Sequence, residues 1–456
     1  MSNTHDQAMH FIYRQVLERL LEHLTQAQRA SLQLLIQRLL VAAGGVDYVG
    51  QFQLVVVHGP DRKSALLLAC LRAAQLIIAQ RAPATFRMRV LVTSLPISGP
   101  DSLKHHERCF SQLFMQDDPR IDLLMIQGHA LVPFSSRPVT SAAEWAQTRE
   151  SLLLFGHLNQ GRPEAIFGSR LHLQLAEALD RTLEGHDGVA ALVTIIPQRQ
   201  RQRYLAWCRR CLRLAGEPGL SASGVNLASW AEPLRRLHDL VAAPLAAACG
   251  VPPQAGGQHL LRVITVDELL EPEGVDDQLE RMLDLHFSVT ACDAPLAGYF
   301  EADALAQLRL LRDRMLLRKA QGRDFRLGLR RRGKVATVLP FERGSTRFLQ
   351  ALDLNHNQLI CLLCAPFANH GRGLAEFIEC FHPGMLIAVP HLHRALRGNP
   401  SPSGVTQWLM EISGLSLKQL KAIYARQVGQ PARRMLVNLA RRDLALRLMV
   451  HDSRDH

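Results

Sequence analysis

Residues 59–64 are the first part of this 456-residue chain whose types and spacing could do chemistry. They are Gly59, Pro60, Asp61, Arg62, Lys63 and Ser64, and they stand between a short apolar run and a longer helical pattern. In a phosphate-binding loop, backbone amides and a helix N-terminus hold phosphate, a lysine reaches it, and a serine hydroxyl holds magnesium. The candidate phosphate-binding residues here are Gly59, Arg62, Lys63 and Ser64.

This loop departs from the phosphate-binding signature in two ways. Only three residues separate Gly59 from Lys63, and no second glycine precedes the lysine. Asp61 would also put a negative charge where phosphate should lie. We therefore expect a degenerate nucleotide-binding fold without catalytic residues, and an NTPase that uses this loop is the third hypothesis for function.

Two further segments resemble parts of signalling domains. The apolar run at residues 262–266 ends in Asp267 and Glu268 and resembles the first strand of receiver domains, whose acidic pair binds magnesium. Two apolar runs, at residues 349–354 and 359–363, flank a polar turn, so we expect a β-hairpin. This hairpin resembles that of diguanylate cyclase domains, but its turn lacks the family's glycines and carboxylates. The resemblance therefore implies the fold without cyclase activity.

The most specific pattern lies in residues 409–429. Gly414 is placed to end one helix, Ser416 is placed to cap the next, and Leu420 and Tyr424 share one face. The pattern predicts a helix-turn-helix, a motif whose second helix reads DNA bases while cations hold the phosphates. The predicted DNA-binding residues are Ser416, Lys418, Gln419, Lys421, Arg426, Arg433 and Arg434.

This segment resembles the first helix-turn-helix of AraC-type transcription regulators. The family's recurring positions are matched here by Gly414, Leu415, Ser416, Leu420, Tyr424 and Gly429. Beyond them the spacing departs, since Pro431 stands one place early and Arg441 and Ala445 one place late. The resemblance covers about 45 residues. It implies DNA binding that is weak unless the protein forms a dimer.

The charge distribution also favours a polyanionic partner. The chain has 53 Lys and Arg against 41 Asp and Glu, a net charge of +12. Residues 315–348 hold 10 cations and 2 anions, and residues 401–456 hold 9 and 4, so these two segments carry the surplus. Such a field attracts DNA, RNA, a nucleotide or an anionic surface. Further candidate phosphate contacts are Arg330, Arg331, Arg332 and Arg347.

The elements that must position these residues follow a β–α alternation. Helical periodicity fills the first 43 residues, and apolar strands are predicted at residues 53–57, 88–94, 121–126 and 189–196. Strands separated by helices indicate a mainly parallel sheet. The fold class is therefore α/β, with degenerate nucleotide-fold modules, an N-terminal helical segment and an all-helical C-terminal subdomain. The predicted units are residues 1–45, a loop-bearing domain at 46–215, a receiver-like module at 258–320, a cyclase-like module at 321–398 and a helical unit at 405–456.

Composition excludes several classes of protein. With 47% hydrophobic and 21% charged residues, the chain is neither disordered nor collagen-like. No apolar run reaches the roughly 18 residues of a membrane span. The first residues lack the pattern of a signal peptide, and nine scattered cysteines do not form a disulfide framework. We expect a cytoplasmic protein with no membrane span.

These observations leave three hypotheses for function. The leading one is a non-enzymatic regulator of bacterial type that binds DNA through its C-terminal helix-turn-helix, while its N-terminal part senses a ligand or forms a homodimer. The alternative rests on the order of the modules, which also resembles the cyclic di-GMP-binding regulatory proteins of bacterial cellulose secretion, although their Arg-x-Gly-Asp motif is absent here. The third is the NTPase. No metal is expected, and the ligand of the alternative is a nucleotide or cyclic dinucleotide.

Overall fold

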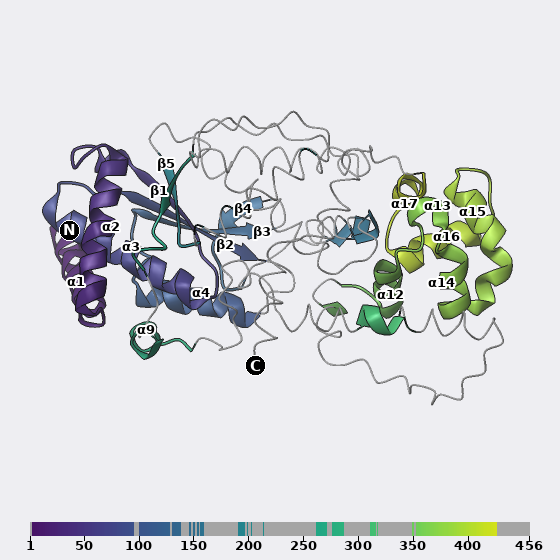
Figure 1. Ribbon diagram of the computed structural model, residues 1–456, viewed down its shortest axis with the longest axis horizontal. Helices are drawn as coiled ribbons and strands as arrows, with labels where there is room; N and C mark the ends of the chain where they lie inside the picture. Colours follow the sequence, from purple (N-terminus) through teal and green to yellow (C-terminus); the bar gives the residue numbers. More distant parts are fainter. Residues whose placement is uncertain are drawn as a thin grey trace.

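The computed structural model contains an α/β domain and a helical domain (Figure 1). Residues 2–94, 100–127, 130–137, 190–196, 261–270 and 276–286 are described in the first domain, and residues 353–425 in the second. Also described are positions 146, 149–150, 153–154, 156–158, 198, 202, 213, 311–315, 317 and 349–350. The remaining positions lie outside the described residues, among them Arg330, Arg331, Arg332, Arg347, Arg426, Arg433 and Arg434.

Among the described residues, six strands form one sheet, and its order confirms the mainly parallel α/β fold. The strands are β1 (Gln53–Val57), β2 (Arg87–Ser94), β3 (Ile121–Gln127), β4 (Ala130–Pro133), β5 (Ala190–Thr194) and β6 (Leu261–Thr265). Their order is β4-β3-β2-β1-β5-β6, and all neighbours are parallel except β3 and β4. The order reverses at β1, because the chain builds outward through β2 and β3 and then returns to the other side of β1.

The last strand corrects one predicted boundary. β6 pairs along its whole length with β5, from Ala190 opposite Leu261 to Thr194 opposite Thr265. The strand assigned to a receiver-like module at 258–320 therefore extends the sheet that begins at β1. A separate sheet does not start there.

Helices cover this sheet in two layers. α1 (Ser2–Glu22) and α2 (Gln26–Ala43) confirm the predicted N-terminal helices, and both pack against α3 (Arg62–Arg81). Leucines of α1 and α2 belong to the same hydrophobic core as the strands, so the two helices are part of the α/β domain. α4 (Pro100–Gln112) follows β2 and contacts α9 (Asp276–Leu283).

Of the helices described in this domain, α3 is the most deeply buried. Fifteen of its 20 residues are buried, because α1 and α2 cover the face that the sheet does not. Among the described helices, α3 has the length and apolar composition that would also fit a membrane span. However, 83% of its most apolar 18-residue stretch is buried inside the protein. One of its fully buried residues is a cation, Arg72.

Every nitrogen of the Arg72 guanidinium has a hydrogen-bond partner inside the protein. Its Nε donates to the Leu113 carbonyl at 3.1 Å, and its Nη2 donates to the Phe114 carbonyl at 2.9 Å. Its Nη1 donates to Gln75 Oε1 and to Asp118 Oδ2, both at 2.7 Å. These contacts join α3 to the segment that leads from α4 into β3.

Asp118 holds a second guanidinium beside the first. Arg120 donates from Nε to Asp118 Oδ1 at 2.8 Å and from Nη2 to Asp118 Oδ2 at 2.6 Å. The ring of Tyr13 in α1 lies 5.2 Å from the Arg72 Cζ and 4.8 Å from the Arg120 Cζ. Burial alone would raise the pKa of Asp118, but the hydrogen bonds from Arg120 and the charge of Arg72 outweigh it and lower the pKa to about 2.

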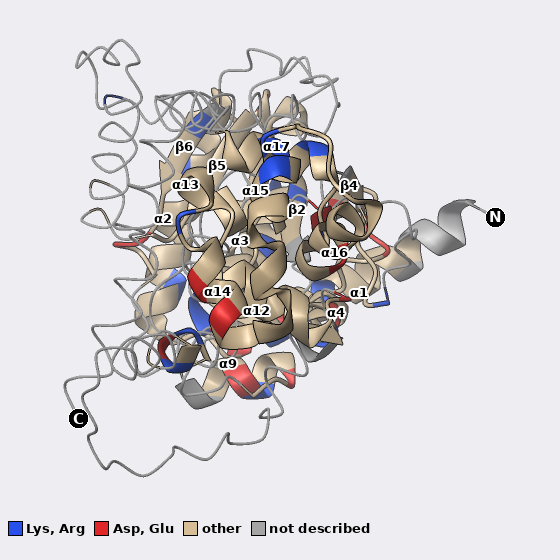
Figure 2. Cartoon of the chain, turned by 90° about the vertical axis from the view of Figure 1, so that its right-hand side faces the viewer, with Lys and Arg blue, Asp and Glu red and all other residues tan. Residues whose placement is uncertain are grey.

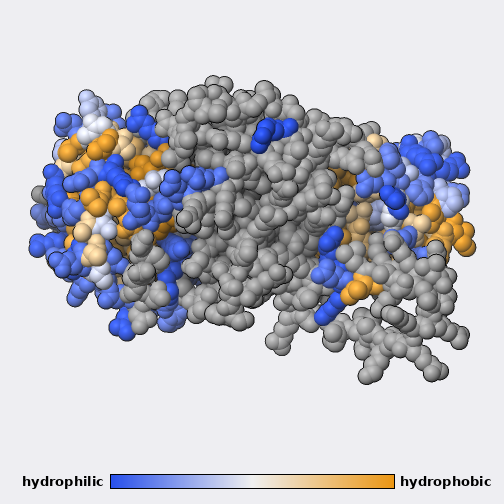
Figure 3. All heavy atoms as spheres, viewed as in Figure 1, coloured by the Kyte–Doolittle hydropathy of each residue, from blue (hydrophilic) through white to orange (hydrophobic). Residues whose placement is uncertain are grey.

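The helical domain has a core of its own. Its elements are α12 (His356–Cys364), α13 (Ala368–Gly371), α14 (Leu374–Phe381), η4 (Pro383–Ala388), α15 (Val389–Leu396), α16 (Ser403–Ser413) and α17 (Leu417–Tyr424). Their apolar faces meet in one cluster, which also takes in Leu153, Leu154 and Met315 from earlier in the chain. η4 exposes Leu386 and Ile387, and Figure 3 shows hydrophobic surface at this end of the molecule.

The predicted β-hairpin at residues 349–363 is wrong. Residues 356–364 form α12, and Asn355 caps it by accepting from the Gln358 amide at 2.8 Å while Gln358 accepts from the Asn355 amide at 3.2 Å. The polar stretch that was expected to turn between two strands is therefore a capping box. The described part of the predicted cyclase-like module at 321–398 is helical.

The predicted boundary between residues 398 and 405 is also corrected. α16 packs against α15 and α12, and Leu409 shares a core with Leu359 and Leu392. The stretch at 399–402 is thus a short connection within one domain, although its prolines and serine resemble a linker.

A left-handed turn brings α13 close to α17. Asn369, His370 and Gly371 have φ of 57°, 58° and 68°. A Cβ at Gly371 would stand 2.8 Å from Cε2 of Tyr424, so both the left-handed backbone and the lack of space favour glycine there.

The described cysteines are free thiols. They are Cys70, Cys109, Cys361, Cys364 and Cys380.

We expect Asp118→Asn to lower the free energy of unfolding by about 3–5 kcal/mol, because it leaves the buried Arg72 without its counter-charge. Urea titration at pH 7 measures this loss. Asp122→Asn is the matched control, since its 3.0 Å pair with Arg89 lies at the surface and should contribute at most about 1 kcal/mol. A similar loss in both variants would contradict the expected role of burial.

The buried pair of Arg72 and Asp118 also predicts that the free energy of unfolding depends on pH. The pKa of Asp118 is about 2 in the folded protein, below its ordinary value of 3.8, so the unfolded state takes up this proton first. The stability that the carboxylate contributes is full above that ordinary value and is lost as the pH falls toward 2. The difference between wild type and Asp118→Asn should shrink over this range.

Candidate functional site

The carboxyl edge of the sheet is the first place to look for a site. In open parallel sheets, ligands bind beyond the carboxyl ends of the strands where the strand order reverses. Here that place lies beyond β1 and β5, and residues 58–61 connect β1 to α3 across it. The predicted strand, loop and helix around residues 59–64 are confirmed.

The loop's own carboxylate occupies the position expected for phosphate. Asp61 caps α3: its Oδ1 accepts from the amide of Ser64 at 3.0 Å, and its Oδ2 accepts from the Ser64 hydroxyl at 2.6 Å. The amide and hydroxyl that would hold phosphate and magnesium are thus engaged by a side chain. Burial raises the pKa of Asp61, while the hydrogen bonds from Ser64 act in the opposite direction.

The cations of the loop are also engaged within the protein. Arg62 donates to Glu280 of α9 at 2.6 Å, and both side chains are mostly buried. Gly59 is buried and Lys63 is half-buried. The structure therefore places Gly59, Arg62, Lys63 and Ser64 in one loop, where Asp61 engages Ser64 and Glu280 engages Arg62.

Two buried histidines stand behind this loop, and sequence reasoning missed both. His58 follows β1 and has no exposed surface, and His106 of α4 lies with its ring centroid 4.9 Å from that of His58. Both nitrogens of His58 lack a hydrogen-bond partner among the described residues. Burial, and then the charge of His105, lower the pKa of His58 to about 3, so the ring is neutral. A histidine directly after a buried strand was the available signal.

This edge does not hold a metal centre in the described part of the chain. No group of three or more histidine, cysteine, aspartate or glutamate side chains is arranged to bind a metal ion there. The acidic pair that resembled a receiver site is divided: Asp267 accepts from the Gln198 amide at 3.1 Å, while Glu268 forms an ion pair with Arg38 of α2.

The two helices and the turn predicted at residues 409–424 are present in the structure. α16 ends at Gly414, whose φ is 69°, and Ser416 begins α17. The Ser416 side chain accepts from the amide of Gln419, and Gln419 Oε1 accepts from the amide of Ser416 at 2.9 Å. Tyr424 and Leu420 face the core as expected.

One predicted DNA-reading residue is corrected. Gln419 is 1% exposed, and its side chain serves the capping box and donates to Glu150 at 2.5 Å. It therefore does not face a DNA groove. Ser416 and Lys418 are exposed, and Lys421 is half-buried. Arg426, Arg433 and Arg434 lie outside the described residues.

Two arginines that were not predicted lie at the end of α15, the helix that contacts α17. They are Arg394 and Arg397, and both are exposed. Lys421 Nζ is 4.0 Å from the place where a Cβ of Gly398 would stand. We call these four cations, Arg394, Arg397, Lys418 and Lys421, the basic surface.

The basic surface has a fixed frame, and the Glu150 carboxylate contacts α17 beside it at Gln419. The Nδ1 of His393 in α15 lies 3.0 Å from the Tyr424 hydroxyl of α17, which joins the two helices. None of the four cations forms an ion pair with a described residue. Figure 2 shows blue cations on α17 next to α15, whereas the red carboxylates of α14 lie lower in the same view.

Comparison with known proteins gives no further guide. No protein-family model, characterised protein or solved structure matches this chain. The chemistry of the described residues is what bears on function.

We expect Asp61→Ala to lower the free energy of unfolding by about 1–2 kcal/mol, because α3 loses its N-cap. Asp61→Ser should restore most of that stability, since a serine also caps a helix but carries no charge. Chemical denaturation of both variants provides the measurement. If serine proved as destabilising as alanine, capping would not be what Asp61 contributes.

His58 predicts a loss of stability in mild acid. Its pKa is about 3 when folded and its ordinary value is 6.5, so between these values the unfolded state binds a proton that the folded state does not. Stability should fall with decreasing pH by up to about 1.4 kcal/mol per unit from this group. His58→Leu should show a shallower slope between pH 6 and 4.5 and the same slope as wild type above pH 7. Identical slopes in mild acid would contradict this assignment.

Proposed function

We propose that this protein is a cytoplasmic, non-enzymatic regulator that binds duplex DNA through its helical domain. The observation that carries the proposal is a helix-turn-helix whose second helix, together with the end of α15, presents four cations without ion-pair partners among the described residues. Unpaired arginines and lysines on a rigid surface attract the phosphates of nucleic acids.

The side chains favour contact with phosphates over reading of bases. Gln419, which has the amide suited to adenine, is buried, and the exposed groups of α17 are chiefly Ser416 and Lys418 with part of Lys421. Phosphate contacts set the position and strength of binding but carry no sequence information. Binding should therefore be strongly salt-dependent and weakly selective.

A second copy of the chain would make binding more selective for DNA sequence. Helix-turn-helix proteins gain specificity by placing two motifs on half-sites about one helical turn apart. A homodimer is thus part of the proposal for any sequence-specific action.

The two other hypotheses lack a comparable observation among the described residues. The hairpin on which the cyclase-like resemblance rested is a helix, and the arginines proposed for a cyclic dinucleotide lie outside the described residues. An NTPase would need the Ser64 hydroxyl and amide that Asp61 holds.

The test is binding to a duplex DNA pool by fluorescence anisotropy at several salt concentrations. Full-length Lys418→Gln/Lys421→Gln and Arg394→Gln/Arg397→Gln are compared with wild type. Each double variant should weaken binding and make the slope of log K against log salt shallower by about one to two units, because each phosphate contact releases about one counterion.

The matched control is Arg81→Gln/Arg87→Gln, which removes the same charge from exposed sites of the α/β domain. It should leave the slope nearly unchanged. Equal losses in control and test variants, or an unchanged slope in both test variants, would overturn the proposal.

A further inference from the structure

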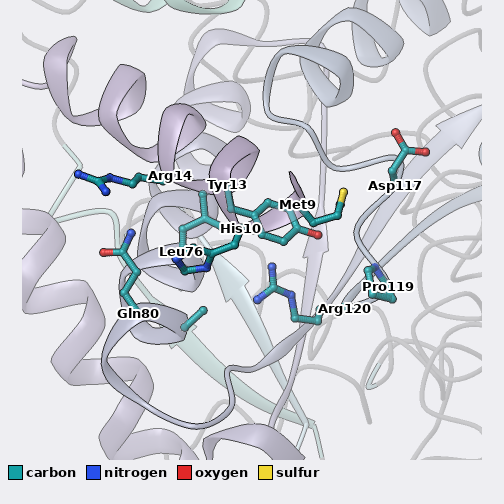
Figure 4. Close-up of a pocket in the computed structure, with 10 residues that line it drawn as sticks. Met9, His10, Tyr13, Arg14, Leu76, Gln80, Asp117, Pro119 and Arg120 are labelled. Atoms are coloured by element: carbon teal, nitrogen blue, oxygen red, sulfur yellow. The ribbon is translucent and has the colours of Figure 1, made fainter. Parts of the chain in front are cut away.

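A pocket of about 340 Å³ lies at the amino edge of the sheet, opposite the loop that follows β1 (Figure 4). α3 starts beyond the carboxyl end of β1 and runs back, so its last turns reach this edge, and β3 begins there at Ile121. α1, the end of α3 and residues 117–120 form the walls. A pocket of this size accepts a small organic molecule.

The floor of the pocket carries an excess of positive charge. Arg72 and Arg120 share the single carboxylate of Asp118, so the group keeps a net charge of +1. Burial and the nearby Asp118 raise the pKa of Tyr13, which keeps its phenol neutral. Because Arg72 and Asp118 have no exposed surface, water screens this excess charge poorly, and an anion at Arg120 would compensate it.

The pocket also has an apolar wall and two charged side chains that point away from its middle. Figure 4 shows His10, Tyr13 and Arg120 around the middle of the pocket, while the guanidinium of Arg14 and the carboxylate of Asp117 point away from it. Arg14 pairs with Glu18 at 2.9 Å. The apolar wall consists of Met9, Leu76, Ala79 and Pro119.

We propose that this pocket binds a small organic monoanion with a flat apolar body, of which aromatic carboxylates are the chemical class. The carboxylate would pair with Arg120 and accept from His10, and the body would lie on the Tyr13 ring and the apolar wall. The N-terminal domain is then a ligand-sensing domain. This pocket shares no residue with the basic surface, so the ligand proposal does not depend on DNA binding.

The test is isothermal titration of the full-length protein with three probes. Benzoate has both the charge and the ring, benzamide keeps the ring without the charge, and acetate keeps the charge without the ring. Benzoate should bind at least about tenfold more tightly than either. Absence of benzoate binding at millimolar concentration would overturn the site, and equal affinity for benzamide or acetate would overturn the assigned class.

A variant pair places the binding in this pocket. Ala79→Phe fills the apolar wall and keeps Arg72, Asp118 and Arg120 in the sequence, and it should weaken benzoate binding at least tenfold. Ala30→Phe makes the same change at an exposed position of α2 and should leave binding unchanged. Thermal unfolding confirms that both variants are folded. Wild-type affinity in a folded Ala79→Phe protein would refute the assignment.

Discussion

The fully buried guanidinium of Arg72 constrains how the elements of the α/β domain pack together. Arg72 lies in the buried part of α3, and burying its charge is tolerable only because one carboxylate, one amide and two carbonyls reach it. Those partners come from α3 itself and from the chain between α4 and β3, so the position of that chain is fixed relative to α3. Arg120 and the ring of Tyr13 then assemble on the same carboxylate. The charge of the nearby pocket follows from this requirement, and the Tyr13 ring adds cation–π contacts to the apolar packing of α1.

Much of the α/β domain is predictable because local patterns and the final burial agree. The apolar runs of β1, β2 and β3 are bounded by helices, and a parallel sheet is the arrangement that buries such runs. The hairpin error shows where the same reasoning fails. A short apolar run such as residues 359–363 fits a strand or a buried helix equally well. The deciding signal was the pair Asn355 and Gln358, which has the spacing of a capping box.

The site residues were harder to predict because their roles depend on distant partners. Gln419 meets Glu150, 269 positions away in the chain, and Asp118 compensates a charge 46 positions earlier. Nothing local to Gln419 shows that Glu150 covers it. Its spacing from Ser416 does show that its side chain is engaged, because Thr25 and Gln28 make the same capping box in α2. Glutamine three residues after a capping side chain therefore recurs in this protein, and each time it is used locally.

Asp61 also has a consequence for any ligand that approaches this loop. In proteins that cradle a nucleotide at this place in the fold, the anion comes and goes with the ligand. Here the carboxylate that caps α3 is covalently part of the chain, so it cannot leave the loop as a nucleotide does. A phosphate could reach the amide and hydroxyl of Ser64 only after the Asp61 side chain had rotated away from both. The free energy of these two hydrogen bonds therefore opposes the binding of an anion at this position.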